Sequence, residues 1–188
     1  MKSNFLTLIL LFFLTSPLTA QEIAVPVPVQ VSLFSKILSY DRNLETRAGK
    51  EIILGVVFQS RFKRSLNVKD DFITAMNENK IKTIKKIPLR VIPIDIYDTD
   101  LAKTIEQFKI NVLYVTPLRA VDIASISSIS QTKKIMTLTG VPEYSNNGIS
   151  VSIGLKGEKP LIIINIKAAK AENIDFGSQL LKLAKVIQ

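Results

Sequence analysis

The chain has 188 residues, 47% of them hydrophobic, and a formal net charge of +9 with no His and no Cys. This length supports one sizeable core, so a single domain is expected. Without imidazole or thiol groups, the common transition-metal sites, cysteine nucleophiles, histidine-based triads and disulfides are excluded. No Walker A or G-x-G-x-x-G sequence is present. We predict that the protein is not an enzyme and uses no metal or cofactor.

The first twenty residues have the order of a signal peptide. Lys2 is followed by an apolar run from Phe5 to Leu14, a break at Pro17 and small residues ending at Ala20. The run is shorter than the roughly 18 to 20 residues that cross a bilayer, which disfavours a membrane anchor or a buried first helix. We predict residues 1–20 to be a signal peptide, cleaved near Ala20 on export to the periplasm. Loss of Lys2 takes the net charge from +9 to +8.

Residues 21–30 are expected to form a Pro-containing leader, because Pro26 and Pro28 do not propagate a helix. Residues 31–188 then form one α/β domain. It opens with apolar residues at helical spacing, which indicates a helix with one buried face: Leu33, Phe34, Ile37 and Leu38.

Strand and helix patterns alternate through the middle of the chain. A wholly apolar run at 52–58 indicates a strand covered on both faces. Further strands are expected at 89–97, where Pro93 is unusual for a central strand, and at 111–116 and 134–140. Helices are expected at 66–79, 101–108 and 118–130. Strands connected through helices predict right-handed crossovers and a mostly parallel sheet between helical layers, a three-layer αβα sandwich.

The last third of the chain has a different pattern. Strands at 148–155 and 160–166 are separated by a short connection containing Gly157, which predicts an antiparallel hairpin. Asn165 is expected to hydrogen-bond the turn after the second strand. Residues 179–187 have the spacing of an amphipathic closing helix, with Ser178 or Asp175 as its N-cap.

The basic charge bears on the choice of partner. In an exported protein it favours anionic lipid, polysaccharide or an acidic protein surface over nucleic acid. The densest basic stretch, residues 79–90, has no interleaved aromatic residues and is interpreted as a solvated connector rather than a binding patch.

Two short patterns have ordinary explanations. Ser130 and Lys133 have the S-x-x-K spacing of serine acyl-transfer enzymes, but the companion S-D-N and K-T-G motifs are missing, so chance spacing is favoured. Asp95, Asp98 and Asp100 offer oxygen ligands but lack the Gly and distal Glu of a calcium loop, and helix capping accounts for them.

The predicted topology favours one place for a ligand. Binding crevices of open parallel sheets form beyond the carboxyl ends of the strands. The loops expected there carry polar side chains suited to a small anion, although ordinary loop caps and surface charges are the plainer interpretation. The candidates are Gln59, Ser60, Arg61, Thr116, Arg119, Thr139, Gly140, Glu143 and Tyr144.

The C-terminal sequence, from Thr137 to Ala184, resembles the YfiR-like family of exported bacterial proteins. Matching features are the "TLTG" strand end, Gly148, a strand ending in "IN", the pair Ala168–Ala169, and "SQLLKLA". "LFSKILSYDRNL" and "ILGVVF" are also similar to the family's opening helix and first strand, so the resemblance extends over nearly all of the mature chain.

The resemblance implies a compact periplasmic module without catalysis. In the best-understood member, the module sequesters the periplasmic sensor domain of an inner-membrane diguanylate cyclase. The present sequence lacks that member's cysteines, which leaves disulfide-based redox control unsupported and the partner open. The resemblance transfers no functional residue. We expect a regulatory binding protein that does not span the membrane and binds no nucleic acid, with a homodimer left open. The alternative is a periplasmic receptor for a small molecule or anion that uses the strand-end loops.

Overall fold

The computed structural model describes residues 24–188, and the predicted signal peptide lies outside this part of the chain. In chain order, the elements are α2 (Val27–Ser39), α3 (Leu44–Ala48), β1 (Ile52–Phe58), α4 (Lys63–Glu78), β2 (Thr83–Ile84), β3 (Ile87–Asp95), α5 (Leu101–Phe108), β4 (Val112–Val115), α6 (Ile123–Lys133), β5 (Met136–Thr139), the 3-10 helix η2 (Pro142–Asn147), β6 (Val151–Lys156), β7 (Lys159–Asn165), α7 (Ile166–Ala171), α8 (Ser178–Leu183) and β8 (Lys185–Ile187).

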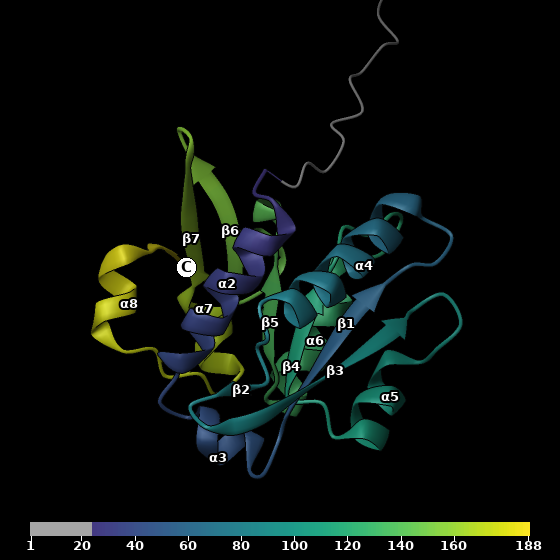
Figure 1. Ribbon diagram of the computed structural model, residues 1–188, viewed down its shortest axis with the longest axis horizontal. Coiled ribbons are helices and arrows are strands. Elements are labelled where there is room, and N and C mark those ends of the chain that lie inside the picture. Colours follow the sequence, from purple (N-terminus) through teal and green to yellow (C-terminus); the bar gives the residue numbers. More distant parts are fainter. Residues whose placement is uncertain (1–23) are drawn as a thin grey trace, which may run out of the picture.

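The strands form one sheet in the order β2-β3-β1-β4-β5-β6-β7-β8 (Figure 1). Strands β3, β1, β4, β5 and β6 are parallel to one another, whereas β7 pairs antiparallel with β6 and β2 pairs antiparallel with β3. The predicted mostly parallel sheet with a C-terminal antiparallel hairpin is therefore confirmed.

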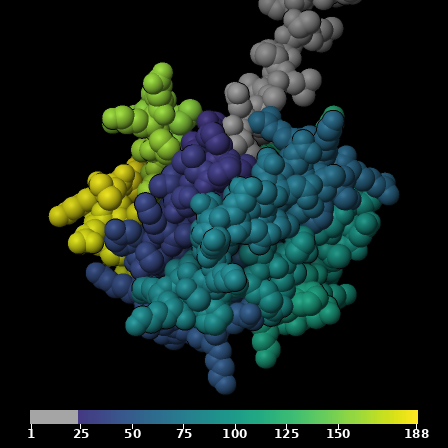
Figure 2. All heavy atoms as spheres, in the orientation of Figure 1, coloured from purple at the N-terminus to yellow at the C-terminus, as the bar shows by residue number. Residues whose placement is uncertain are grey.

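Helices cover both faces of the sheet. On one face, α2 and α4 lie side by side (Figure 2) and contribute Phe34 and Phe72 to the core. Tyr114 of β4 stacks on Phe72 with 4.1 Å between ring centroids and meets the edge of Phe34. On the other face, α5, α6 and η2 contribute a second apolar cluster. In residues 24–188, none of the helices is long and apolar enough to cross a bilayer.

Helix α2 begins inside the predicted leader, so the expectation of a non-helical stretch is wrong for residues 27–30. Pro26 is the N-cap and Pro28 lies in the first turn. First-turn N–H groups have no acceptor within a helix, so proline removes no hydrogen bond there. The added turn also buries Gln30, whose Nε2 donates to the carbonyl oxygen of Val25 at 2.6 Å.

Pro93 is explained by its place near the sheet edge. Strand β2 pairs with β3 only at Ile87 and Pro88, and the backbone N–H of Leu89 still donates to Lys82 on that side. Since strand residues alternate in direction, the position of Pro93 faces the same outer side. Because Pro93 lacks an N–H only on this outer side, no hydrogen bond with β1 is lost. The exposed edge of β3 also offers one donor fewer for pairing with another chain.

The chain ends differently from the prediction. Helix α8 stops at Leu183, and β8 then pairs in parallel with β7 from Ile163 to Asn165. Of the α8 residues, Leu180 is buried, while the Leu183 side chain is 71% exposed. The helix predicted over 179–187 is therefore correct only in its first half, because pairing with β7 satisfies the last backbone groups better than another helical turn.

Two further boundaries matter for the site. Helix α6 begins at Ile123, after the Asp122 N-cap, and not at Leu118. Leu118 instead anchors the preceding loop in the core. Asn165 caps α7 as expected, its side chain accepting a hydrogen bond from the Ala168 N–H at 2.9 Å.

Candidate functional site

The carboxyl ends of β1, β4 and β5 lie next to one another. Val57 pairs with Val115, and Val115 pairs with Thr139. The loops that follow these strands therefore meet at one edge of the sheet, as the predicted topology required.

The loops after β1 and β4 are joined by a reciprocal pair of hydrogen bonds. The Gln59 side chain accepts from the Arg119 N–H at 2.7 Å and donates to the Arg119 carbonyl at 3.1 Å. Beneath this pair, Thr116 Oγ1 donates to the Val57 carbonyl and lies 2.6 Å from Ser65 Oγ. The structure thus brings together Gln59, Thr116 and Arg119 from the sequence-predicted set.

The loop after β5 is also fixed by internal bonds. Thr139 Oγ1 donates to the Val115 carbonyl at 2.8 Å, and Tyr144 Oη accepts from the Leu118 N–H at 2.8 Å. Gly140 lies against buried Gln30, and a Cβ at this position would be 2.2 Å from Gln30 Oε1. Thr139, Gly140 and Tyr144 are buried and have these structural partners.

Ser60 and Arg61 lie toward the end of β3. The Ser60 N–H donates to Asp95 Oδ1 at 3.2 Å, and the Arg61 guanidinium lies 3.9 Å from the ring centroid of Tyr97 and donates to its hydroxyl. Partial burial pushes the pKa of Asp95 upward, but hydrogen bonds from Ser60 and Tyr97, with the Arg61 charge, hold that pKa below its ordinary value. The loop is therefore stabilised with Asp95 ionised.

The predicted residues divide into a buried group and an exposed group, with Gln59 half-buried between them. Thr116, Thr139, Gly140 and Tyr144 are buried, whereas Ser60, Arg61, Arg119 and Glu143 are exposed. Sequence reasoning missed Tyr97, which is 48% exposed. The sequence placed Tyr97 inside the strand predicted at 89–97, whereas β3 ends at Asp95 and leaves Tyr97 in the loop that follows. We call Arg61, Tyr97 and Arg119 the strand-end surface; ligand binding by the predicted set stays a prediction.

The other side chains considered for catalysis or metal binding form hydrogen bonds and ion pairs within the protein. Ser130 Oγ lies 2.8 Å from the carbonyl oxygen of Ser127 and 2.9 Å from Glu172 Oε1, within hydrogen-bond distance of both, while Lys133 pairs with Glu106. Asp100 caps α5 by accepting from the Lys103 N–H. Across residues 24–188, no group of three or more His, Cys, Asp or Glu side chains is placed to hold a metal ion.

Glu172 is a buried carboxyl that the sequence did not single out. It accepts hydrogen bonds from Ser130 Oγ, Thr137 Oγ1 and the Thr137 N–H, and its side chain has no cation among these partners. Burial raises the pKa of Glu172 to about 7, even though hydrogen bonds from Ser150, Thr137 and Ser130 lower it. These bonds connect the end of α7 to α6 and β5.

Comparison with solved structures supports the fold. A conserved domain protein from Vibrio cholerae O1 biovar El Tor is similar with a TM-score of 0.59 and 14% identity, over 87% of this chain and 60% of that one. The ABC domain from Streptococcus pneumonia in complex with L-Trp has a TM-score of 0.59 and 15% identity, over 86% and 60%. The chain thus spans 60% of the length of each of these proteins.

Comparison of the sequence with curated proteins gives no significant match. The sequence model of the YfiR/HmsC-like family, in contrast, matches residues 30–185, from α2 to the first residue of β8. The match takes in both helical layers and the main sheet, as the resemblance of the C-terminal sequence predicted. The chain belongs to the YfiR/HmsC-like family.

Proposed function

We propose that the protein is a non-catalytic periplasmic regulator that sequesters or modulates the sensor domain of an inner-membrane signalling protein, such as a diguanylate cyclase. The family match over residues 30–185 carries this proposal. Export follows from the predicted signal peptide, and the mature charge of +8 favours an acidic face on the partner.

The strand-end surface is the docking site that we propose for this partner. Arg and Tyr are enriched among residues that dominate binding energy, and here Arg61 lies over the ring of Tyr97. Stacking preorganises the guanidinium, which reduces the conformational entropy lost on binding. Arg119 adds a second exposed cation on a loop fixed by Gln59.

The receptor alternative has less support at this edge. Most polar groups of the predicted set already bond within the protein, as described for Gln59, Thr116 and Thr139. A small ligand would have to compete with these bonds, whereas a protein partner needs only the exposed side chains.

The experiment is capture of membrane proteins on the tagged mature domain at low and high salt. We expect a membrane sensor with a periplasmic domain, recovered better at low salt because exposed charges are screened at high salt. The double variant Arg61→Ala, Tyr97→Ala should lose it, whereas Lys156→Ala, Lys159→Ala at the exposed β6–β7 turn should retain it. Recovery of no membrane sensor, or equal recovery by both variants, would contradict the proposal.

A further inference from the structure

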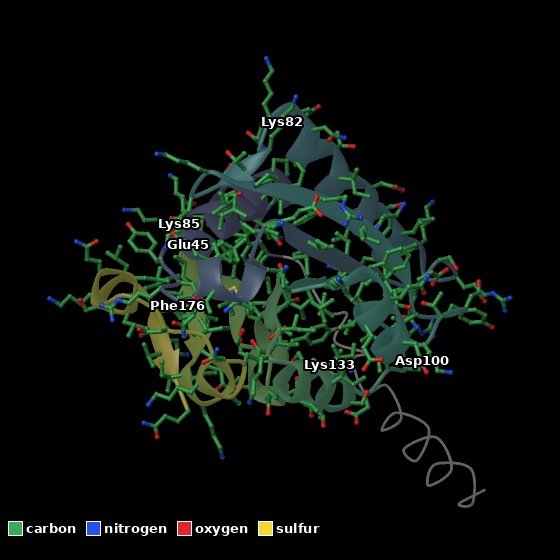
Figure 3. All side chains as sticks on the ribbon, turned by 90° about the horizontal axis from the view of Figure 1, so that it is seen from below. Glu45, Lys82, Lys85, Asp100, Lys133 and Phe176 are labelled. Atoms are coloured by element: carbon green, nitrogen blue, oxygen red, sulfur yellow. The ribbon has the colours of Figure 1, made fainter. Side chains whose placement is uncertain are left out.

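An open cavity of about 600 Å³ lies where strands β1 and β4 begin, at the opposite end of these strands from the strand-end surface. It is bordered by α3 and the loop that follows it, the beginnings of β1 and β4, and the end of α5. Figure 3 views the molecule from this side, with Lys85 and Glu45 marking where the β2–β3 turn meets α3. The volume lies in the range of about 300–1,000 Å³ typical of small-molecule sites.

The lining of this cavity is basic. Four cationic side chains line it, Arg47, Lys50, Arg90 and Lys109, together with one carboxylate, Glu51. Arg90 is paired with Glu51, with Nη2 to Oε2 at 3.0 Å and Nε to Oε1 at 3.1 Å. Lys50 and Lys109 form no salt bridge within residues 24–188. Two positive charges beside the cavity are therefore without an acidic partner.

Arg47 gives an independent indication of a ligand. Its side chain is only 7% exposed, and Nη2 donates to Asp41 Oδ2 at 2.6 Å. Its Nε and Nη1 are buried and have no hydrogen-bond acceptor. The other oxygen of Asp41 already accepts from the N–H groups of Asn43 and Asp175. A buried donor without an acceptor is unfavourable, so an oxyanion that reached Nε and Nη1 would supply the acceptor that these two nitrogens lack.

The remaining walls suit an organic body attached to that oxyanion. Phe108 lines the cavity with 39% of its surface exposed, and the apolar Ile53 lies at the start of β1. The Asn111 side chain accepts from the Ile53 N–H and donates to the Glu51 carbonyl. It therefore shapes the wall and leaves binding to the cations.

We propose that this cavity binds a small organic anion, a carboxylate or phosphate ester, with its charged group near Arg47, Lys50 and Lys109 and its apolar part against Phe108. The proposal does not depend on the regulatory function proposed above, since the two surfaces lie at opposite ends of the parallel strands.

The test is a titration of the ¹⁵N-labelled mature protein with phenyl phosphate at low salt, followed by NMR, with phenol as the uncharged counterpart. We expect saturable shifts of the Gly49, Lys50 and Lys109 amides with phenyl phosphate and none with phenol. No saturable shift up to about 10 mM phenyl phosphate, or the same shifts with phenol, would overturn the proposal.

Variants separate the site from general charge. The double variant Lys50→Gln, Lys109→Gln should weaken phenyl phosphate binding about tenfold, and so should Arg47→Lys, which keeps a cation beside Asp41 but lacks the unpartnered Nε and Nη1 donors. The control Lys156→Gln, Lys159→Gln removes equal charge at the exposed β6–β7 turn and should leave the Kd unchanged. Equal weakening by the control, or full binding by Arg47→Lys, would refute the assigned site.

Discussion

Replacing the buried carboxyl of Glu172 by an amide should remove a pH dependence of stability. In the folded protein, burial raises the pKa of Glu172 from 4.5 to about 7. The unfolded chain therefore releases this proton at lower pH than the folded chain does. The contribution of Glu172 to the unfolding free energy is therefore fully present below pH 4.5 and is lost as the pH rises through about 7.

The pKa difference corresponds to about 3 kcal/mol of unfolding free energy between the two limits. In Glu172→Gln, Oε1 accepts the Thr137 N–H, and Nε2 donates to the hydroxyl of Ser130 or Thr137, as a protonated carboxyl would. The variant should lose this dependence and, at pH 8, be more stable than the unmodified protein by up to about 3 kcal/mol.

The assay is urea unfolding of the mature protein at intervals from pH 5 to pH 8. Glu158→Gln, at the exposed β6–β7 turn, serves as the control and should follow the unmodified protein. If the Glu172→Gln and unmodified curves have the same slope against pH, the raised pKa is refuted.

Burial, close packing and the predicted signal peptide lead to three further expectations. Leu180→Ala should lower the unfolding free energy by about 2–5 kcal/mol and Leu181→Ala by less than half as much, because only Leu180 is fully buried; equal losses in chemical denaturation would contradict the position of α8. Gly140→Ala should cost about 1–3 kcal/mol because its Cβ meets the Gln30 amide, and a second change, Gln30→Ala, should then cost less than it does alone; additive losses in a double-mutant cycle would argue against this contact. Intact-mass measurement of the periplasmic protein should give a chain that begins after Ala20, and retention of residues 1–20 would defeat the export prediction.

Strands β1 and β4 were predictable because each is an uninterrupted apolar run. Residues 52–58 are the strand β1 itself, and Asp100 begins α5 where a capping residue was expected. Elements at the edge of the sheet were harder to predict from the sequence. Strand β2 turns into β3 at Lys85 and Lys86, both with positive φ, where the sequence has none of the Gly or Asn residues that usually mark such a turn.

The end of the chain was misread for a different reason. The spacing of Leu180, Leu183, Ala184 and Ile187 suits a helix equally well. Only the open edge of β7 selects a strand for the residues of β8. The spacing of apolar residues shows which face of a segment is buried, but it does not show that a neighbouring strand has an unpaired edge.

Polar residues caused most of the errors at the candidate sites. Gln30, Glu172 and the pair Asp41–Arg47 are buried, but polar side chains are assigned to the surface unless a partner is known. Their side-chain partners come from 6 to 84 positions away in the chain. The sequence therefore located the strand-end loops but not the bonds that fix them, and it gave no indication of the basic cavity.

Under the proposed function, the protein restrains a membrane signalling protein by binding it. The most direct measurement is cellular cyclic-di-GMP in a strain that lacks the gene, complemented either with the unmodified gene or with the Arg61→Ala, Tyr97→Ala variant. Deletion should raise cyclic-di-GMP, the unmodified gene should restore the lower level, and the variant should fail to do so although it is exported and folded. Unchanged cyclic-di-GMP on deletion would contradict regulation of a diguanylate cyclase, and full restoration by the variant would contradict the role of the strand-end surface.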